Sequence, residues 1–209
     1  MGFAYRKCIR CLSRHENYIV SITKIGKPTI ASGGHDHTII IWHFIKGTCL
    51  LKIKLDTKCK IITSLIKLNS TQIINACWDN SIMIWDLTKE ECIKTLYGHA
   101  GFALCLCLLS KNQFASCSRD KTIKIWDIDT SSCIKTLYGH EDLVSCIAKI
   151  NGSQLASCSW DKTIKIWDLL TGSCIKNLYG DEKFSVVAVI NKFQLVSGSK
   201  DKTIMLWDR

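Results

Sequence analysis

Residues 97–137 read YGHAGFALCLCLLSKNQFASCSRDKTIKIWDIDTSSCIKTL and contain four short segments of strand character. Each segment is rich in β-branched, aromatic or small residues, and turn-forming residues such as Ser110, Lys111 and Asn112 separate them. Four strands of this length predict one small sheet. The segments are 102–109, 113–118, 122–127 and 132–137.

The same stretch recurs along the chain with a nearly constant period. An aspartate followed six positions later by a tryptophan occurs five times, and successive tryptophans are 43, 41, 41 and 40 residues apart. A Tyr-Gly-His sequence precedes the third and fourth copies and becomes Tyr-Gly-Asp before the last. Such self-similarity predicts one sheet per copy. The copies end near Trp42, Trp85, Trp126, Trp167 and Trp207.

This pattern, with Gly-His and Trp-Asp signatures in a repeat of about 40–45 residues, resembles the WD-repeat family. The resemblance covers nearly the whole chain. It implies an all-β fold, a β-propeller of five four-stranded antiparallel blades, in a single domain over residues 1–209. The length agrees, since one all-β domain can reach about 200–250 residues.

The two ends of the chain carry complementary parts of one blade. Residues 7–12 match the fourth strand at 132–137, and the last copy ends at Arg209, after its third strand. In closed propellers of the family both termini build one blade, which removes open sheet edges. The resemblance therefore implies that the N-terminal strand closes the last blade, although most members have seven blades. The alternative is an incomplete propeller that oligomerises or completes its ring with another chain.

The resemblance also implies a role for the repeated polar residues. In WD repeats a histidine, a strand serine or threonine, the turn aspartate and the strand tryptophan form a buried tetrad, because buried polar groups need hydrogen-bond partners. Three copies have all four residues. These are His15, Ser32, Asp36 and Trp42; His99, Ser116, Asp120 and Trp126; and His140, Ser157, Asp161 and Trp167.

Two copies depart from this tetrad. Copy two has Asp56 and Asn75 at the histidine and serine positions, and copy five has Asp181 in place of the histidine. We expect fewer tetrad hydrogen bonds to stabilise these two blades. A Ser-His-Asp set also resembles a hydrolase triad, but catalysis needs one exposed serine with a poised base, whereas this set repeats with the blades. We therefore expect no catalytic residue.

In propellers of this family, the residue before the turn aspartate lies on the top face beside the channel, where members commonly bind peptides. Trp78 and Trp160, the two tryptophans outside the Trp-Asp pattern, fall at this position. Trp and Arg are enriched at interface hot spots. We expect both tryptophans to anchor a peptide with acidic or Lys/Arg-containing segments, unless they only cap the channel. The predicted face comprises His35, Trp78, Arg119, Trp160 and Lys200, with Tyr18, Phe102, Leu143 and Phe184 entering the first strands.

The charge balance favours anionic partners but identifies none. The chain has 28 Lys and Arg against 18 Asp and Glu, a formal charge of +10. The lysines of the Asp-Lys-Thr turns, Lys121, Lys162 and Lys202, repeat with the blades as a basic rim. Nucleic-acid binding would need exposed aromatics interleaved along that rim, so it is a minor option.

The remaining patterns narrow the function class. The chain has thirteen cysteines and no signal peptide, which favours reduced thiols and a cytoplasmic or nuclear location. No apolar span reaches about 18 residues, so we expect no membrane insertion. The pairs Cys8/Cys11 and Cys105/Cys107 lack the second half of a zinc ligand set, so we expect no metal and no cofactor. The sequence thus predicts a non-catalytic scaffold or adaptor for other proteins rather than an enzyme with a site in its channel.

Overall fold

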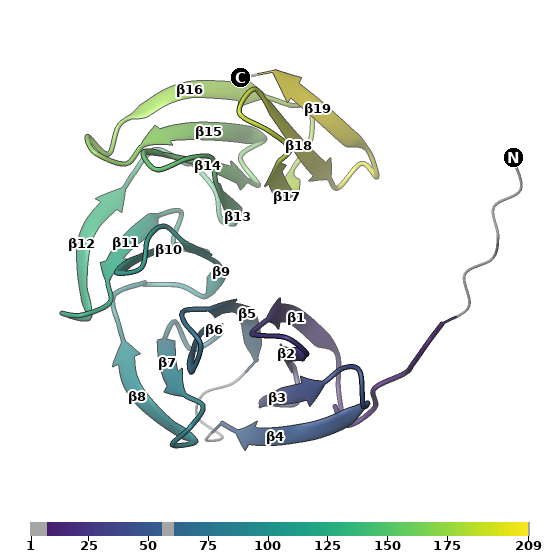
Figure 1. Ribbon diagram of the computed structural model, residues 1–209. Helices are drawn as coiled ribbons and strands as arrows, with labels where there is room; N and C mark the ends of the chain where they lie inside the picture. Colours follow the sequence, from purple (N-terminus) through teal and green to yellow (C-terminus); the bar gives the residue numbers. More distant parts are fainter. Residues whose placement is uncertain (1–7, 56–60, 209) are drawn as a thin grey trace, which may run out of the picture.

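The computed structural model describes residues 8–55 and 61–208. These residues form five antiparallel sheets, four of four strands and one of three, and neighbouring strands within a sheet follow chain order. Figure 1 shows the sheets side by side along an arc around a channel, with the first strand of each innermost. The expected five-bladed propeller is confirmed. The same residues include no helix that is long and apolar enough to cross a membrane.

Each blade takes its strands in order from the channel outwards. The strands of the described residues are β1 (Ile19–Lys24), β2 (Thr29–Gly34), β3 (Thr38–His43), β4 (Thr48–Lys54), β5 (Ile62–Lys67), β6 (Gln72–Cys77), β7 (Ile82–Asp86), β8 (Glu91–Leu96), β9 (Ala103–Leu108), β10 (Gln113–Ser118), β11 (Ile123–Asp127), β12 (Ser132–Leu137), β13 (Val144–Lys149), β14 (Gln154–Ser159), β15 (Thr163–Asp168), β16 (Cys174–Tyr179), β17 (Phe184–Val189), β18 (Gln194–Ser199) and β19 (Ile204–Asp208).

Consecutive blades pack face to face through the same four positions of the repeat. Between the third and fourth blades these positions are Ile123 and Ile125 of β11 and Val144 and Ile147 of β13, each at most 5% exposed. The corresponding residues lie in the core of the other three interfaces. Because side chains alternate along a strand, the two isoleucines of β11 share one face. Each blade therefore contributes half of an interface on each of its faces.

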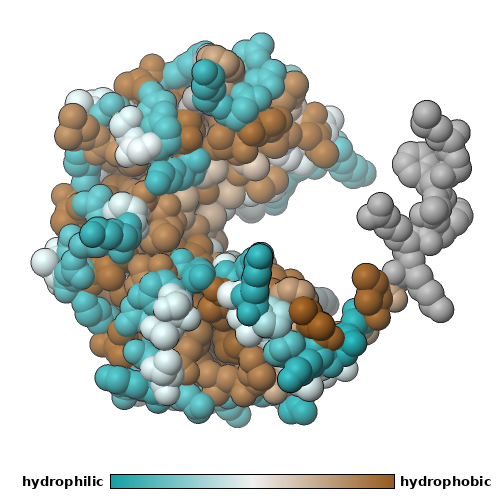
Figure 2. All heavy atoms as spheres, in the orientation of Figure 1, coloured by the Kyte–Doolittle hydropathy of each residue, from teal (hydrophilic) through white to brown (hydrophobic). Residues whose placement is uncertain are grey.

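The first and last blades each leave one such half exposed. On the last blade Ile204 and Leu206 are 81% and 62% exposed, and on the first blade Ile19 and Ile22 are 46% and 62% exposed. The matching residues inside the arc are 0–6% exposed. Figure 2 shows the opening between the two ends of the arc. The described ring is therefore open, with an apolar face on either side of the gap.

The segment expected to close the last blade lies against the first one. Residues 8–12 form no strand and do not pair with β19, and Lys7 lies outside the described residues. Arg10 donates from Nη1 to the carbonyl of Lys46, in the turn between the third and fourth strands of the first blade. Lys94 and Lys135, on the fourth strands of the second and third blades, likewise donate to carbonyls that follow the third strand of the next blade. This segment thus borders the first blade as a preceding fourth strand would, and its pairing with the last blade stays a prediction.

Candidate functional site

One backbone hydrogen bond per blade brings two side chains to the same end of the channel. The N–H of the residue before the turn aspartate donates to the carbonyl of the residue that enters the first strand. This bond measures 2.9 Å from Arg119 to Phe102 and 3.1 Å from Trp160 to Leu143. Five equivalent pairs therefore surround the channel entrance. They are His35/Tyr18, Trp78/Ile61, Arg119/Phe102, Trp160/Leu143 and Lys200/Lys183.

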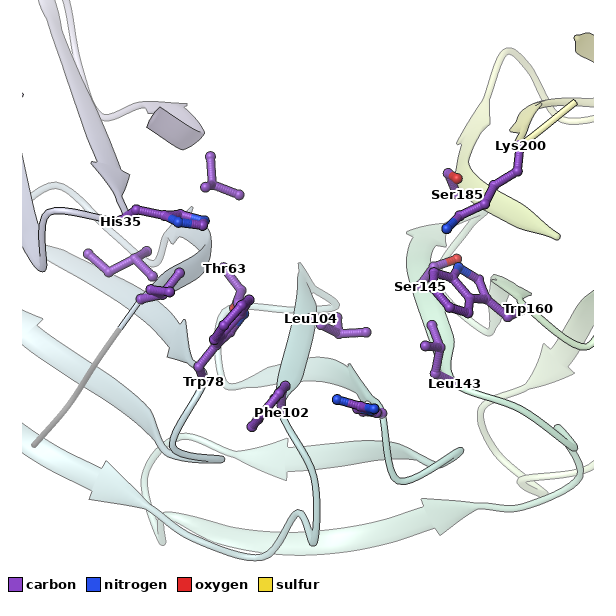
Figure 3. A pocket seen from close by; sticks show the side chains of 14 residues that line it. His35, Thr63, Trp78, Phe102, Leu104, Leu143, Ser145, Trp160, Ser185 and Lys200 are labelled. Atoms are coloured by element: carbon purple, nitrogen blue, oxygen red, sulfur yellow. The ribbon is translucent and has the colours of Figure 1, made fainter. Parts of the chain in front are cut away.

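One or both residues of each pair line a cavity of about 540 Å³ in the channel, shown in Figure 3. Trp78 and Phe102 face the cavity from one side, and Trp160 and Lys200 face it from the other. The second residues of the first strands, such as Leu104 and Ser145, also line the cavity. Seven residues of the predicted face line the cavity. They are His35, Trp78, Phe102, Arg119, Leu143, Trp160 and Lys200.

Two residues of the predicted face lie elsewhere. Phe184 is fully buried between the last two blades, and placing it on the channel face was wrong. The loop before it is one residue shorter than in the other copies, which shifts Phe184 into the strand, and Lys183 takes the position at the entrance instead. Tyr18 is 77% exposed and contacts the edge of His35 without lining the cavity. Counting 24 residues back from each signature tryptophan would have found Ile61 and Lys183.

Aromatic rings from the first three blades form a continuous array along one side of the entrance. Trp78 and Phe102 are stacked with ring centroids 5.2 Å apart and planes 6° from parallel. His35 meets Trp78 edge-on at 5.8 Å, and the guanidinium carbon of Arg119 lies 5.5 Å from the Phe102 centroid. Ring pairs in such geometries attract each other beyond the effect of burial. The array is therefore held in place before any ligand binds.

Trp160, on the opposite side, carries two cations of the last blade. Lys200 Nζ lies 3.7 Å and Lys183 Nζ 4.6 Å from the centroid of its ring. An ammonium this close to an indole is attracted by the negative face of the ring. Both lysines are thereby positioned at the entrance.

Two hydroxyl groups of the channel wall are already engaged. Thr63 donates from Oγ1 to the carbonyl of Ala103 (2.6 Å), and Ser145 donates from Oγ to the carbonyl of Phe184 (2.8 Å). Each bond connects the first strand of one blade to that of the next. The protons of these two hydroxyls are therefore already used within the wall.

Beside the channel, each of the three complete copies contains a chain of hydrogen bonds through all four tetrad residues. In the fourth blade, His140 Nδ1 is 2.7 Å from Asp161 Oδ2, its Nε2 is 2.7 Å from Ser157 Oγ, and Trp167 Nε1 donates to that oxygen at 2.8 Å. The third and first blades repeat these contacts at 2.6–2.8 Å. A carboxylate only accepts and an indole N–H only donates, so with a neutral histidine the serine proton points to the imidazole. The serine hydroxyl thus accepts the indole proton and donates its own proton to the histidine.

The aspartates of the tetrads are held as anions. Burial alone would raise the pKa of Asp120 and Asp161, but hydrogen bonds from the histidine and from the threonine two residues later outweigh it, so both pKa values are lowered. Ser116 and Ser157 are fully buried. The arrangement stabilises the turn between the second and third strands of the blade, and a substrate has no access to the buried serine.

Some tetrad positions of the second and fifth blades hold other residues than those of the complete copies. Asn75 takes the place of the serine and accepts the Trp85 indole proton at 2.7 Å, while Asp56 lies outside the described residues. In the fifth blade Trp207 still donates to Ser197, but Asp201 accepts mainly from the backbone and side chain of Thr203, with Asp181 in place of the tetrad histidine. The hydrogen bonds of Trp207 and Asp201 agree with the weaker tetrad expected for the last blade.

Cysteine side chains pack between the blades. The Sγ atoms of Cys105 and Cys146, on neighbouring first strands, are 3.8 Å apart. Burial raises the pKa of the Cys158 thiol to about 12. Residues 8–55 and 61–208 contain no cluster of three or more His, Cys, Asp or Glu side chains that could hold a metal ion.

Comparisons with known proteins match this architecture. The family model "WD domain, G-beta repeat" matches residues 6–43, 90–127, 131–168 and 172–208, and so leaves out the second copy. The crystal structure of the WD40 beta propeller domain of Doa1 superposes with a TM-score of 0.85 at 24% identity, over 95% of this chain and 66% of that one. The chain thus spans just under two thirds of that structure. A search of curated protein sequences found no match.

Proposed function

Since the chain belongs to the WD-repeat family of β-propellers, we propose that it is a non-catalytic interaction module that binds a peptide segment of another protein at the channel entrance. The observation that carries this proposal is the cavity in which Trp78 and Trp160 face each other from opposite sides of the channel. Members of the family usually bind other proteins. Clustered aromatic side chains at a surface cavity favour binding over the capping alternative.

The absence of catalysis is part of the proposal. The repeated Ser-His-Asp sets lie in the blade interior, where each serine already accepts the indole proton of a tryptophan. A nucleophilic serine needs access to a substrate and a base that is free to take its proton. The structural role explains these residues fully.

Alanine substitution of Trp78 and of Trp160 should weaken peptide binding by at least about tenfold each, because each removes a large contact surface from the cavity wall. The probe is a peptide selected from a phage-displayed random library on the wild-type chain, and fluorescence anisotropy gives its affinity. Tyr97 and Tyr138, which are exposed and do not line the cavity, provide matched controls. Unchanged affinity in both tryptophan variants would overturn the proposal.

A second role is supported by the exposed end faces. Ile204 and Leu206 on one side of the gap and Ile19 and Ile22 on the other are the two halves of an interface that the arc contains four times. In this second role, blades of another polypeptide complete the ring. A substitution at an end face then weakens the assembly and has little effect on the isolated chain.

A further inference from the structure

The charged groups at the channel entrance have one sign. The cavity lining contains Arg119 and Lys200 but no carboxylate, and Lys183 lies beside it on Trp160. The ion pairs found among residues 8–55 and 61–208 do not involve Arg119, Lys183 or Lys200. Lys162, outside the cavity, by contrast lies 3.8 Å from Glu182. Among the described residues, the entrance thus brings together three cations that form no ion pair.

The aromatic rings that could attract a cationic ligand are already in contact with the protein's own groups. Lys200 and Lys183 lie over the ring of Trp160, and Arg119 lies over the ring of Phe102. Trp78 is stacked on Phe102. A lysine or arginine of a ligand would have to approach these rings against the repulsion of the resident cations. A carboxylate would meet charge-assisted donors instead.

The resident cations are also held near the positions where they would bind an anion. Contact with the rings restricts the long side chains of Lys200 and Arg119, so less conformational entropy is lost when a carboxylate binds. The wall between them is apolar, with Leu104 and Leu143 facing the cavity. The ligand that fits this wall has an apolar side chain next to its acidic groups.

We propose that the channel entrance selects an acidic peptide segment, in which an apolar side chain enters the cavity between Trp78 and Trp160 and flanking Asp or Glu carboxylates pair with Arg119 and Lys200. This inference rests on the proposed peptide-binding function and adds the chemistry of the partner. It decides between the acidic and the basic segments that the sequence left open.

Three fluorescein-labelled peptides of equal length test the selection. Each has a central leucine and phenylalanine, flanked by Asp and Glu, by Asn and Gln, or by Lys and Arg. The acidic peptide should bind at least about tenfold more tightly than the neutral one, and the basic peptide most weakly. The double variant Arg119→Gln/Lys200→Gln should lose that preference and bind the acidic and the neutral peptide with similar affinity.

The matched control is the double variant Lys121→Gln/Lys202→Gln. These lysines lie two residues further along the same turns, are exposed and do not line the cavity, so the control removes the same charge from a neighbouring position. It should keep the preference. An equal loss in both double variants would overturn the inference, because net charge alone would then explain the binding.

Other outcomes separate this inference from the proposed function. Three peptides that bind equally well, but lose affinity when Trp78 or Trp160 is replaced, would overturn the acidic selection and leave peptide binding intact. Binding of none of the peptides, together with a library that yields no ligand for this face, would overturn both. A single-stranded oligonucleotide that displaces the acidic peptide at lower concentration would overturn the choice of a peptide partner.

Discussion

Replacing Asp161 with alanine is expected to lower the free energy of unfolding by about 3–5 kcal/mol, because several buried donors lose their acceptor at once. Asp161 accepts from the ring of His140, from the backbone N–H of Glu141, and from both the N–H and the hydroxyl of Thr163. Water can reach only part of this site, since the aspartate side chain is 7% exposed. Urea unfolding followed by circular dichroism measures the change.

Asp201→Ala is the matched control in the fifth blade. Asp201 holds the same place in its turn, but it accepts mainly from Thr203, is more exposed and has Asp181 at the position of the tetrad histidine, so its replacement should cost much less. Equal losses at both positions would contradict the tetrad as the source of stability.

The effect of Asp161→Ala should also depend on pH in a defined direction. The pKa of Asp161 is lowered in the folded chain, so its contribution is complete above the pKa of the unfolded chain, about 3.9, and disappears as the pH falls towards the folded value. The difference between wild type and variant should therefore be constant near neutral pH and shrink below about pH 4. A difference that shrinks between pH 7 and pH 5 would contradict this assignment.

The second large effect concerns the faces between blades. Ile164→Ala should lower the free energy of unfolding by about 2–4 kcal/mol, since this side chain is fully buried between the fourth and fifth blades. Ile204 occupies the same repeat position but is 81% exposed, so Ile204→Ala should have almost no effect on the isolated chain. Urea unfolding of both variants gives the comparison.

Native mass spectrometry of the same samples shows whether another copy covers the end faces. A large loss from Ile204→Ala in a monomer would show that the chain closes its own ring, against the open arc described above. The same loss in an oligomer that the substitution dissociates would support completion of the ring by another chain.

The sequence predicts the blades and their tetrads well, because both depend on local patterns. Strand alternation and turn residues recur within each copy, and the Asp, Ser and Trp of one tetrad lie within about ten residues of each other in the chain. Only the histidine comes from before the first strand. Such short-range constraints are readable from a single sequence.

The channel face was predicted less completely because its register depends on loop length. Counting forward from the histidine position selects Phe184, whereas the backbone bond from Lys200 to Lys183 shows that the shorter last loop moves the entrance position back by one. A shift of one residue turns a side chain to the other face of a strand. Counting from the tryptophan, which lies within the sheet, avoids this error.

The repeat positions left a closed and an open ring as alternatives and could not decide between them. The curvature of the arc depends on how four closely packed interfaces combine, and small differences at each interface add up around the channel. Residues such as Ile19 and Ile204 have the same apolar character as their buried counterparts, so the sequence does not distinguish a covered from an exposed face.

The indole N–H signals of the seven tryptophans test the central claim, binding at the channel entrance, most directly. Five indoles donate to buried acceptors inside the blades, whereas Trp78 and Trp160 line the cavity. In a ¹H–¹⁵N spectrum assigned with single Trp→Phe variants, addition of the acidic peptide should shift the signals of Trp78 and Trp160 and leave the other five in place. Unshifted Trp78 and Trp160 signals at a peptide concentration that saturates binding would contradict it.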